Sequence, residues 1–305
     1  MPEPFVREPF ESLPGLPRVP HPYFGLRTER LEVTTTQLGR VSTHVRVHGS
    51  GPPLLLIHGL MTSSYSFRYV FEPLGRHFTV YGPDLPGAGR SDHPLWPRYT
   101  PTALARWIGE LQRRLGIYGC DVIGNSMGGY LAMTLALLEP DAMRRLVNLH
   151  SPGVPLVRLH ALAAAMAVPG ARHLTAWLAR RNPERWVHRN VHYYDETLKS
   201  IEEAEEYGTP LATRAGSMAL AKYLAETLSP SAMRRFENTL HLRAAFPVPL
   251  LLWYARRDPM VPPLVGRRLA AALPSAELVW LEQASHFAHV DAPERFLAPT
   301  LRFLQ

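Results

Sequence analysis

The sequence of 305 residues predicts an α/β fold, with a mostly parallel sheet and helices on both faces. Short apolar runs without polar alternation recur along the chain, as expected for strands that are covered on both faces. Stretches with helical spacing lie between these runs. Such alternation is typical of right-handed crossover units around a parallel sheet. An apolar content of 46% is sufficient for a full core at this length.

The expected strands form an entry hairpin and a buried set. Residues 29–36 and 40–48 alternate in polarity and are rich in β-branched side chains, which predicts an antiparallel hairpin. The buried runs are residues 53–57, 78–81, 120–123, 146–149, 248–253 and 278–281. The expected helices of the core are residues 65–75, 102–115, 127–139, 262–273 and 293–304.

The domain organisation follows from where this alternation starts and stops. Residues 1–28 are rich in proline and have no apolar period, so we expect an arm that lies over the surface. Residues 153–243 are rich in helix signals and have no clear strand, and we interpret them as a helical cap inserted into the core. The core then comprises residues 29–152 and 244–305.

Composition and charge argue against several classes of function. No apolar run approaches the roughly 20 residues needed to cross a bilayer, and the N-terminal residues contain no signal peptide pattern. We therefore expect a cytoplasmic protein without stable membrane insertion. The net charge is +7, but the basic residues occur as scattered pairs, so nucleic-acid binding is not expected. Nothing in the sequence decides between a monomer and a dimer.

The strongest motif is Gly124-Asn-Ser126-Met-Gly128, which lies directly after a buried strand and directly before an apolar helix. A sharp turn from strand to helix strains its central residue and leaves no room for side chains beside it, which explains the glycines. This context predicts that Ser126 is a nucleophile raised above the sheet. Free N–H groups at the start of the following helix favour an anion at the same place.

A serine nucleophile requires a general base and a group that orients the base. Asp258 follows the buried strand 248–253, and His286 lies in the loop after the last strand. The order Ser, Asp, His is the one expected for such a sheet. His289 is the rival base, but its place near the last helix fits a surface or supporting role better. Asp291, like Glu294, is interpreted as a helix-start carboxylate that complements the helix dipole.

Two backbone N–H groups are expected to form the oxyanion hole. The candidates are the amides of Leu60, after the first parallel strand, and Met127, after the nucleophile. His58 and Gly59 are expected to support this loop, as Gly124 and Gly128 support the nucleophile turn. The chemistry needs no metal and no organic cofactor, and no Cys or carboxylate accompanies the histidine pairs at ligand spacing.

Taken in order, these motifs resemble those of the capped α/β-hydrolase family over roughly residues 30–304. They include Leu-Leu-Ile-His58-Gly59, Asp84-Leu-Pro-Gly-Ala-Gly-Arg-Ser-Asp92 and Gly124-Asn-Ser126-Met-Gly-Gly129. The resemblance implies a sheet of about eight strands, a helical lid over the site and acyl transfer through a serine ester. Haloalkane dehalogenases and epoxide hydrolases resemble the chain in cap and motifs, but they attack with a carboxylate where this chain has Ser126.

The expected activity is hydrolysis of small to medium apolar carboxylic esters by a carboxylesterase. A carbon–carbon hydrolase of ring-fission products or a lactonase remains an alternative with the same triad. The short loop of residues 58–64 departs from the glycine-rich loop usual in the carbon–carbon enzymes. A ligand-binding protein without turnover is the alternative from another class. Candidate pocket residues in the cap are Trp177, Trp186, Tyr194, Met218 and Tyr223.

Overall fold

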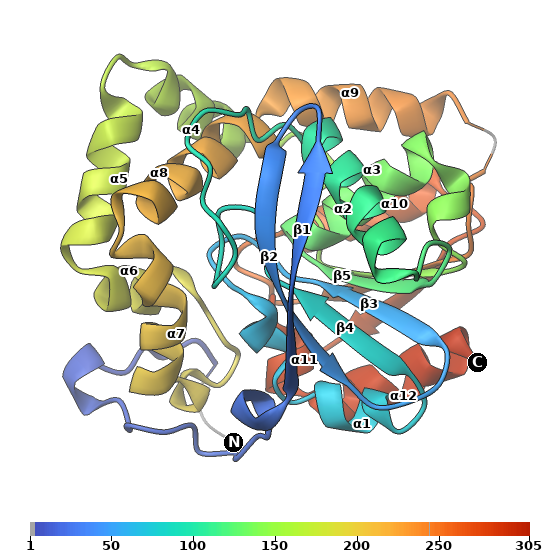
Figure 1. Cartoon of the computed structure of the whole chain (residues 1–305), viewed down its shortest axis with the longest axis horizontal. Coiled ribbons are helices and arrows are strands. Elements are labelled where there is room, and N and C mark those ends of the chain that lie inside the picture. Colours follow the sequence, from blue (N-terminus) through green and yellow to red (C-terminus); the bar gives the residue numbers. More distant parts are fainter. Residues whose placement is uncertain (1–3, 244) are drawn as a thin grey trace.

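The computed structural model describes residues 4–243 and 245–305, and its centre is one sheet of eight strands (Figure 1). The strand order is β1-β2-β4-β3-β5-β6-β7-β8. β1 and β2 pair with antiparallel neighbours, whereas β3 to β8 run parallel. The predicted α/β class, hairpin and mostly parallel sheet are therefore confirmed. The strands are β1 (Arg27–Thr35), β2 (Gly39–His48), β3 (Pro53–Ile57), β4 (Thr79–Pro83), β5 (Asp121–Asn125), β6 (Leu146–Leu149), β7 (Leu250–Ala255) and β8 (Glu277–Leu281).

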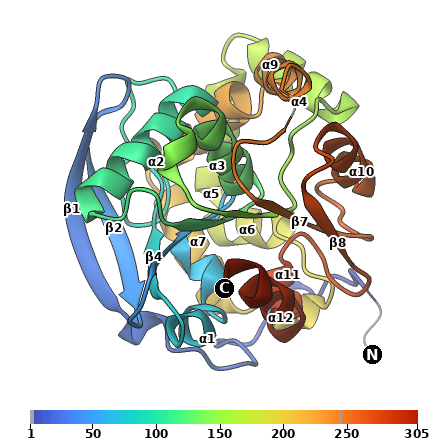
Figure 2. The same ribbon diagram turned by 90° about the vertical axis from the view of Figure 1, so that its right-hand side faces the viewer.

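Helices cover both faces of this sheet (Figure 2). α2 (Pro101–Leu115), α3 (Met127–Leu138) and α10 (Pro263–Ala272) lie on one face, and α1 (Phe71–Gly75) and α12 (Pro293–Leu304) lie on the other. β3 shows why both faces are apolar. Its Leu55 and Ile57 belong to the core on the α2–α3 side, whereas Leu54 and Leu56 belong to the core on the α1–α12 side. A strand buried on both faces needs no polar alternation.

The helix signals of the sequence correspond closely to the helices observed. α2 begins after Thr100, whose hydroxyl accepts a hydrogen bond from the Ala103 N–H, and it ends at Gly116 with φ of 71°. The predicted helix 65–75 is instead two pieces, a 3₁₀ turn at Ser64–Phe67 and α1. A further short helix, α11 (Ala288–Asp291), follows the His286 loop and was not predicted.

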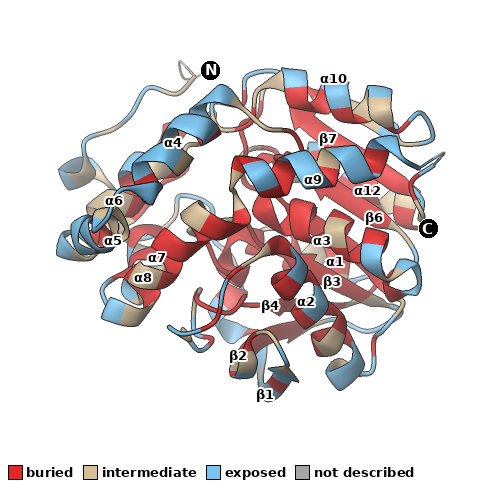
Figure 3. Ribbon diagram, turned by 90° about the horizontal axis from the view of Figure 1, so that it is seen from above, coloured by how far each residue is buried: buried red, intermediate tan, exposed pale blue. Residues whose placement is uncertain are grey.

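The described part of the segment between β6 and β7 consists of helices joined by loops, and most of it lies beside the sheet, at the left in Figure 1. Figure 3 shows the exposed outer faces of α4, α5 and α9, in contrast to the buried sheet. We call residues 153–243, which lie between β6 and β7, the inserted segment. Its helices are α4 (Val157–Ala167), α5 (Ala171–Arg181), α6 (Pro183–Asn190), α7 (Ile201–Leu211), α8 (Arg214–Lys222), the π-helical turn Tyr223–Thr227 and α9 (Pro230–His241).

The N-terminal arm runs beneath α6 and α7 and reaches β1 (Figure 1). It pairs through its backbone with the inserted segment, where the Ile201 N–H donates to the Pro14 carbonyl at 2.9 Å. At its end Tyr23 is fully buried, and its hydroxyl lies 2.7 Å from Ser64 Oγ. The arm is therefore fixed to both the core and the inserted segment. None of the helices in the described residues is long and apolar enough to span a membrane.

Candidate active site

Ser126 stands at the turn between β5 and α3. Its φ of 53° and ψ of −121° lie outside the regions that a serine ordinarily adopts, and its N–H is held by the Leu149 carbonyl at 2.7 Å. A Cβ on Gly124 would come within 2.6 Å of Gly129, and one on Gly128 would come within 2.2 Å of the Ile57 carbonyl oxygen. The glycines of the motif thus allow the start of α3 to lie close to β5 and to the end of β3.

Strained backbone is concentrated around this turn. Met61 with φ of 61° and His150 with φ of 50° are further residues other than glycine in the left-handed region. They follow the carboxyl ends of β3 and β6, the two strands that flank β5. Such conformations persist only where the surrounding structure imposes them, and they cluster at functional sites. Together with Ser126, these two strained residues indicate that this edge of the sheet is the candidate functional site.

Asp258 and His286 are brought together at the same edge. Asp258 Oδ2 lies 2.7 Å from His286 Nδ1, and its Oδ1 accepts the N–H groups of Met260 and Val261 at 2.6 and 2.8 Å. Burial acts to raise the pKa of Asp258, but the partner histidine and these N–H groups outweigh burial and hold the pKa below its usual range. The carboxylate therefore remains ionised and orients the imidazole, so that Nε2 is the nitrogen left free for a substrate or a hydroxyl.

The loop after β3 supplies Leu60, the first expected oxyanion donor. His58 holds this loop, because its Nε2 accepts the Leu85 N–H at 2.9 Å while its Nδ1 lies 2.8 Å from the Gly59 carbonyl oxygen. Burial lowers the pKa of His58, which keeps the ring neutral and Nε2 an acceptor. This is the supporting role that the sequence predicted for His58. Met127, the second expected donor, is the first residue of α3.

Two residues that sequence reasoning missed hold the base and the acid in place. Asn125 Nδ2 donates to the His286 carbonyl at 3.1 Å. His150 Nε2 accepts the Ala255 N–H at 2.8 Å, three residues before Asp258. Burial lowers the pKa of His150 to about 3, so the ring stays neutral beside His286 and keeps that acceptor nitrogen. The only signal for Asn125 in the sequence was its place in the Gly124–Gly128 motif, directly before Ser126, and none marked His150.

A pocket of about 520 Å³, part of it open to solvent, joins the nucleophile and the base. We call it the Ser126 pocket. Its walls come from the β3 and β5 loops, the Asp258 and His286 loops and the inserted segment. The lining residues are Gly59, Leu60, Asn125, Ser126, Pro152, Leu156, Arg158, Leu159, Leu228, Met233, Met260, Val261, His286 and Phe287. Apart from the catalytic candidates and Arg158 the side chains of this wall are largely apolar, which suits a substrate with an apolar body.

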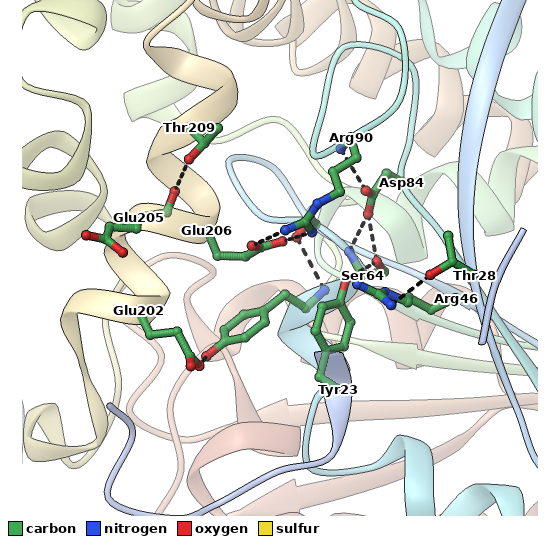
Figure 4. A network of polar contacts seen from close by, with 12 residues as sticks. Tyr23, Thr28, Arg46, Ser64, Asp84, Arg90, Glu202, Glu205, Glu206 and Thr209 are labelled. Carbon is green, nitrogen blue, oxygen red and sulfur yellow. Dashed lines mark hydrogen bonds and ion pairs between the residues drawn. The ribbon is translucent and has the colours of Figure 1, made fainter. Parts of the chain in front are cut away.

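A second pocket, of about 400 Å³, lies on the other side of Leu60, next to Met127. We call it the Glu206 pocket, after the carboxylate on its wall. Glu206 on α7 makes a bidentate ion pair with Arg90, and Asp84 accepts the Arg90 N–H at 2.8 Å (Figure 4). The Asp84–Asp92 motif is therefore a turn that also connects the core to α7. Both pockets share Gly59 and Leu60, so they adjoin at the expected oxyanion hole.

Comparison with known proteins identifies the family of the chain. The family described as alpha/beta hydrolase fold matches residues 52–293. The chain belongs to this family. Its relatives include 2-hydroxymuconate semialdehyde hydrolase of Pseudomonas putida, 30% identical over 86% of this chain and 90% of that protein. Haloalkane dehalogenase 2 of Mycobacterium tuberculosis is 29% identical over 84% of this chain and 91% of that protein. A thermophilic esterase from Thermogutta terrifontis, solved with malate bound, has the same fold, with a TM-score of 0.72 at 23% identity over 90% of this chain and 98% of that one.

The inserted segment of this hydrolase contributes to the pockets differently from the sequence prediction. Tyr223 lines the Glu206 pocket, and its hydroxyl donates to the Pro86 carbonyl at 2.6 Å. The other four candidates line neither of the two pockets, which corrects the prediction for them. Trp177 is 45% exposed on α5. Trp186, Tyr194 and Met218 are partly buried elsewhere in the segment. Aromatic character alone does not distinguish the pocket wall from the helix packing.

The structure also decides the places of two residues after His286. His289 is fully buried in α11, with its ring centroid 4.8 Å from that of Phe67, which excludes the surface role and leaves the supporting one. Asp291 does not serve the start of the last helix. Its Oδ2 accepts the Ser285 N–H at 2.6 Å and its Oδ1 accepts the Tyr194 N–H at 2.8 Å. It therefore ties the loop of the hydrolase that carries His286 to the inserted segment.

The Asp291 carboxyl gives the stability of the hydrolase a specific pH dependence. Burial raises its pKa to about 7, against the opposing effect of the hydrogen bonds from Ser285 and Tyr194. In the unfolded chain the group ionises near pH ~4, so its stabilisation is present below that pH and is lost as the pH rises through about 7. The stability of wild type relative to Asp291→Asn should fall by at least about 1 kcal/mol between about pH 5 and about pH 8.

Urea unfolding of both proteins at the two pH values measures this difference. Glu294→Gln is the matched control, because Glu294 is an exposed carboxylate in the first turn of α12. Its stability difference from wild type should stay nearly constant over the same range. A constant difference for Asp291→Asn as well would contradict the assignment of the raised pKa to Asp291.

In the described residues, no group of three or more His, Cys, Asp or Glu side chains is arranged to hold a metal ion.

Proposed function

We propose that this hydrolase cleaves carboxylic esters through a covalent acyl-enzyme on Ser126. The observation that carries the proposal is the Asp258–His286 contact, because His286 lines one pocket together with the strained Ser126. A neutral serine needs a base within reach, and a base oriented by a carboxylate meets that need. The serine also separates this chain from catalysts that attack with a carboxylate, so halide displacement is not proposed despite the dehalogenase relative.

The reaction would proceed in two halves. Ser126 Oγ attacks the ester carbon while His286 Nε2 takes the hydroxyl proton, and the carbonyl oxygen becomes negative. The backbone N–H groups of Leu60 and Met127 would hold this oxyanion. The C–O bond then breaks as His286 returns the proton to the leaving alcohol. Water, deprotonated by His286, attacks the acyl-enzyme in the same manner and releases the acid and Ser126.

The apolar wall of the Ser126 pocket supports a substrate with an apolar body of small to medium size. We propose that α4 and α9 act as the lid over it, because Leu156, Leu159 and Met233 come from the inserted segment and line the same space as Ser126. Closing such a site excludes water from the oxyanion and strengthens its hydrogen bonds.

A fluorophosphonate probe tests the proposed nucleophile directly. The probe phosphonylates only activated serines, so peptide mass spectrometry should locate one adduct, on Ser126. Turnover of a series of neutral p-nitrophenyl esters should accompany this labelling and should be lost in the labelled protein. No adduct on the folded protein would overturn the proposal and favour a ligand-binding protein, and an adduct confined to another serine would overturn the assignment of Ser126.

Carbon–carbon hydrolysis is the second candidate, because a relative at 30% identity is named as a 2-hydroxymuconate semialdehyde hydrolase. The same triad serves both reactions, and the difference lies in the shape of the pocket. The loop from Gly59 to Ser63 is short, because a 3₁₀ turn begins at Ser64. The carbon–carbon enzymes usually have a longer, glycine-rich loop at this place, so the short loop favours the esterase. Activity confined to a dienone ring-fission product, with no turnover of any ester, would favour this candidate over the esterase.

A further inference from the structure

We infer that the preferred substrates of the Ser126 pocket are esters that carry a carboxylate, which Arg158 of α4 binds. The inference rests on the proposed ester hydrolysis and names its substrate class. Arg158 is the permanently charged side chain in the wall of this pocket, and it lies with Ser126 and His286 among mostly apolar neighbours. A single cation in an apolar wall fixes the orientation of a ligand that carries the opposite charge.

The contacts of Arg158 leave it able to bind such a group. Its Nη1 donates to the Pro259 carbonyl at 3.1 Å, which holds the guanidinium next to the Asp258 loop. Among the described residues, no carboxylate lies within ion-pair distance of it. The guanidinium has five N–H donors in a planar fork that matches a carboxylate, and the Pro259 contact occupies only one of its nitrogens. Nη2 and Nε therefore remain for a bidentate partner.

The two adjoining pockets differ in charge, which would give the substrate one direction of binding. The Glu206 pocket has a carboxylate on its wall, and this carboxylate is paired with Arg90. The Arg90 guanidinium neutralises the Glu206 carboxylate, whereas the Arg158 guanidinium contacts only a backbone carbonyl and attracts an anionic group to the Ser126 pocket. The net charge of +7 further favours the approach of anions to this protein. The carboxylate whose charge acts on the Arg158 guanidinium is that of Asp258, and this carboxylate is itself paired with His286 at 2.7 Å.

A pair of esters that differ only in charge tests the inference. The probes are the p-nitrophenyl monoester of a linear dicarboxylic acid and the same ester with the free carboxylate replaced by its methyl ester. Wild type should prefer the anionic probe, and Arg158→Gln should raise its KM by about 10- to 100-fold, the worth of a charge-assisted hydrogen bond. The KM of the neutral probe should change by less than about twofold. Arg158→Lys keeps the charge without the fork and should recover part of the loss.

Arg267→Gln is the control for a general loss of positive charge, because Arg267 is exposed on α10 and lines neither pocket. It should leave both KM values unchanged. The preference of wild type for the anionic probe should also weaken as salt is added, a measurement that needs no variant.

The outcomes separate this inference from the proposed function. If Arg158→Gln impairs both probes equally, or if wild type does not distinguish them, the inference is overturned while ester hydrolysis stands. An equal loss would assign Arg158 to holding the Asp258 loop through Pro259. If neither probe is hydrolysed and no serine is labelled by the fluorophosphonate, the proposed function fails, and the inference fails with it.

Discussion

Ser126→Ala should lower kcat on neutral esters by about 10⁴- to 10⁶-fold, because the variant lacks the atom that forms the acyl-enzyme. Asp258 and His286 would keep their 2.7 Å contact, and the expected oxyanion donors lie on the backbone. Residual hydrolysis should therefore exceed that in water alone, since binding and oxyanion stabilisation remain. Steady-state rates on the best ester of the p-nitrophenyl series, compared between wild type and variant, measure the loss.

The variant should remain folded, since alanine replaces a residue that has no cap hydrogen bond of its own. Circular dichroism and the urea midpoint establish this. Ser231→Ala is the matched control, because it removes a serine hydroxyl from the exposed part of α9 and should leave kcat within about twofold. Activity that survives in Ser126→Ala would exclude the acyl-enzyme mechanism.

The largest expected effect on stability comes from Gly128→Ala. The added Cβ would lie 2.2 Å from the Ile57 carbonyl oxygen and 2.6 Å from that of His58. Both are backbone atoms at the end of β3, so no side-chain rotation relieves the contact, and α3 must move away from the sheet. We expect the free energy of unfolding to fall by more than about 3 kcal/mol, which is the upper range for overpacking a core.

Urea unfolding of the variant measures this loss, and any soluble folded fraction should have lost ester turnover, because the shift of α3 displaces Met127 and Ser126. Gly15→Ala provides the control for a glycine-to-alanine change, since a Cβ there meets nothing within 4 Å. Its stability should change by less than about 1 kcal/mol. A Gly128→Ala protein as stable as wild type would show that α3 is not packed against the end of β3 as described.

The local signals in the sequence predicted the fold and the site candidates because they arise from neighbouring residues. Apolar runs without alternation mark strands buried on both faces, and residues 53–57 and 146–149 coincide with β3 and β6. The Gly124–Gly128 motif identifies a turn whose strain depends on residues that are adjacent in the chain. The carboxyl ends of parallel strands meet at one edge, so Ser126, Asp258 and His286 were expected to lie close together before their contacts were known.

Only the tertiary structure decided the contacts between segments that are distant in the sequence. Asp291 binds the Tyr194 N–H, and His150 binds the Ala255 N–H, over separations of about a hundred residues. The composition of the pocket walls also depends on contacts between distant segments. Tyr223 lines the Glu206 pocket, whereas Trp177 is exposed and lines neither pocket. Periodicity states that a helix has an apolar face, but it does not state which neighbour that face meets. For this protein the sequence by itself determined the sheet and the catalytic candidates, whereas the supporting contacts and the place of Arg158 depend on how the inserted segment packs on the sheet.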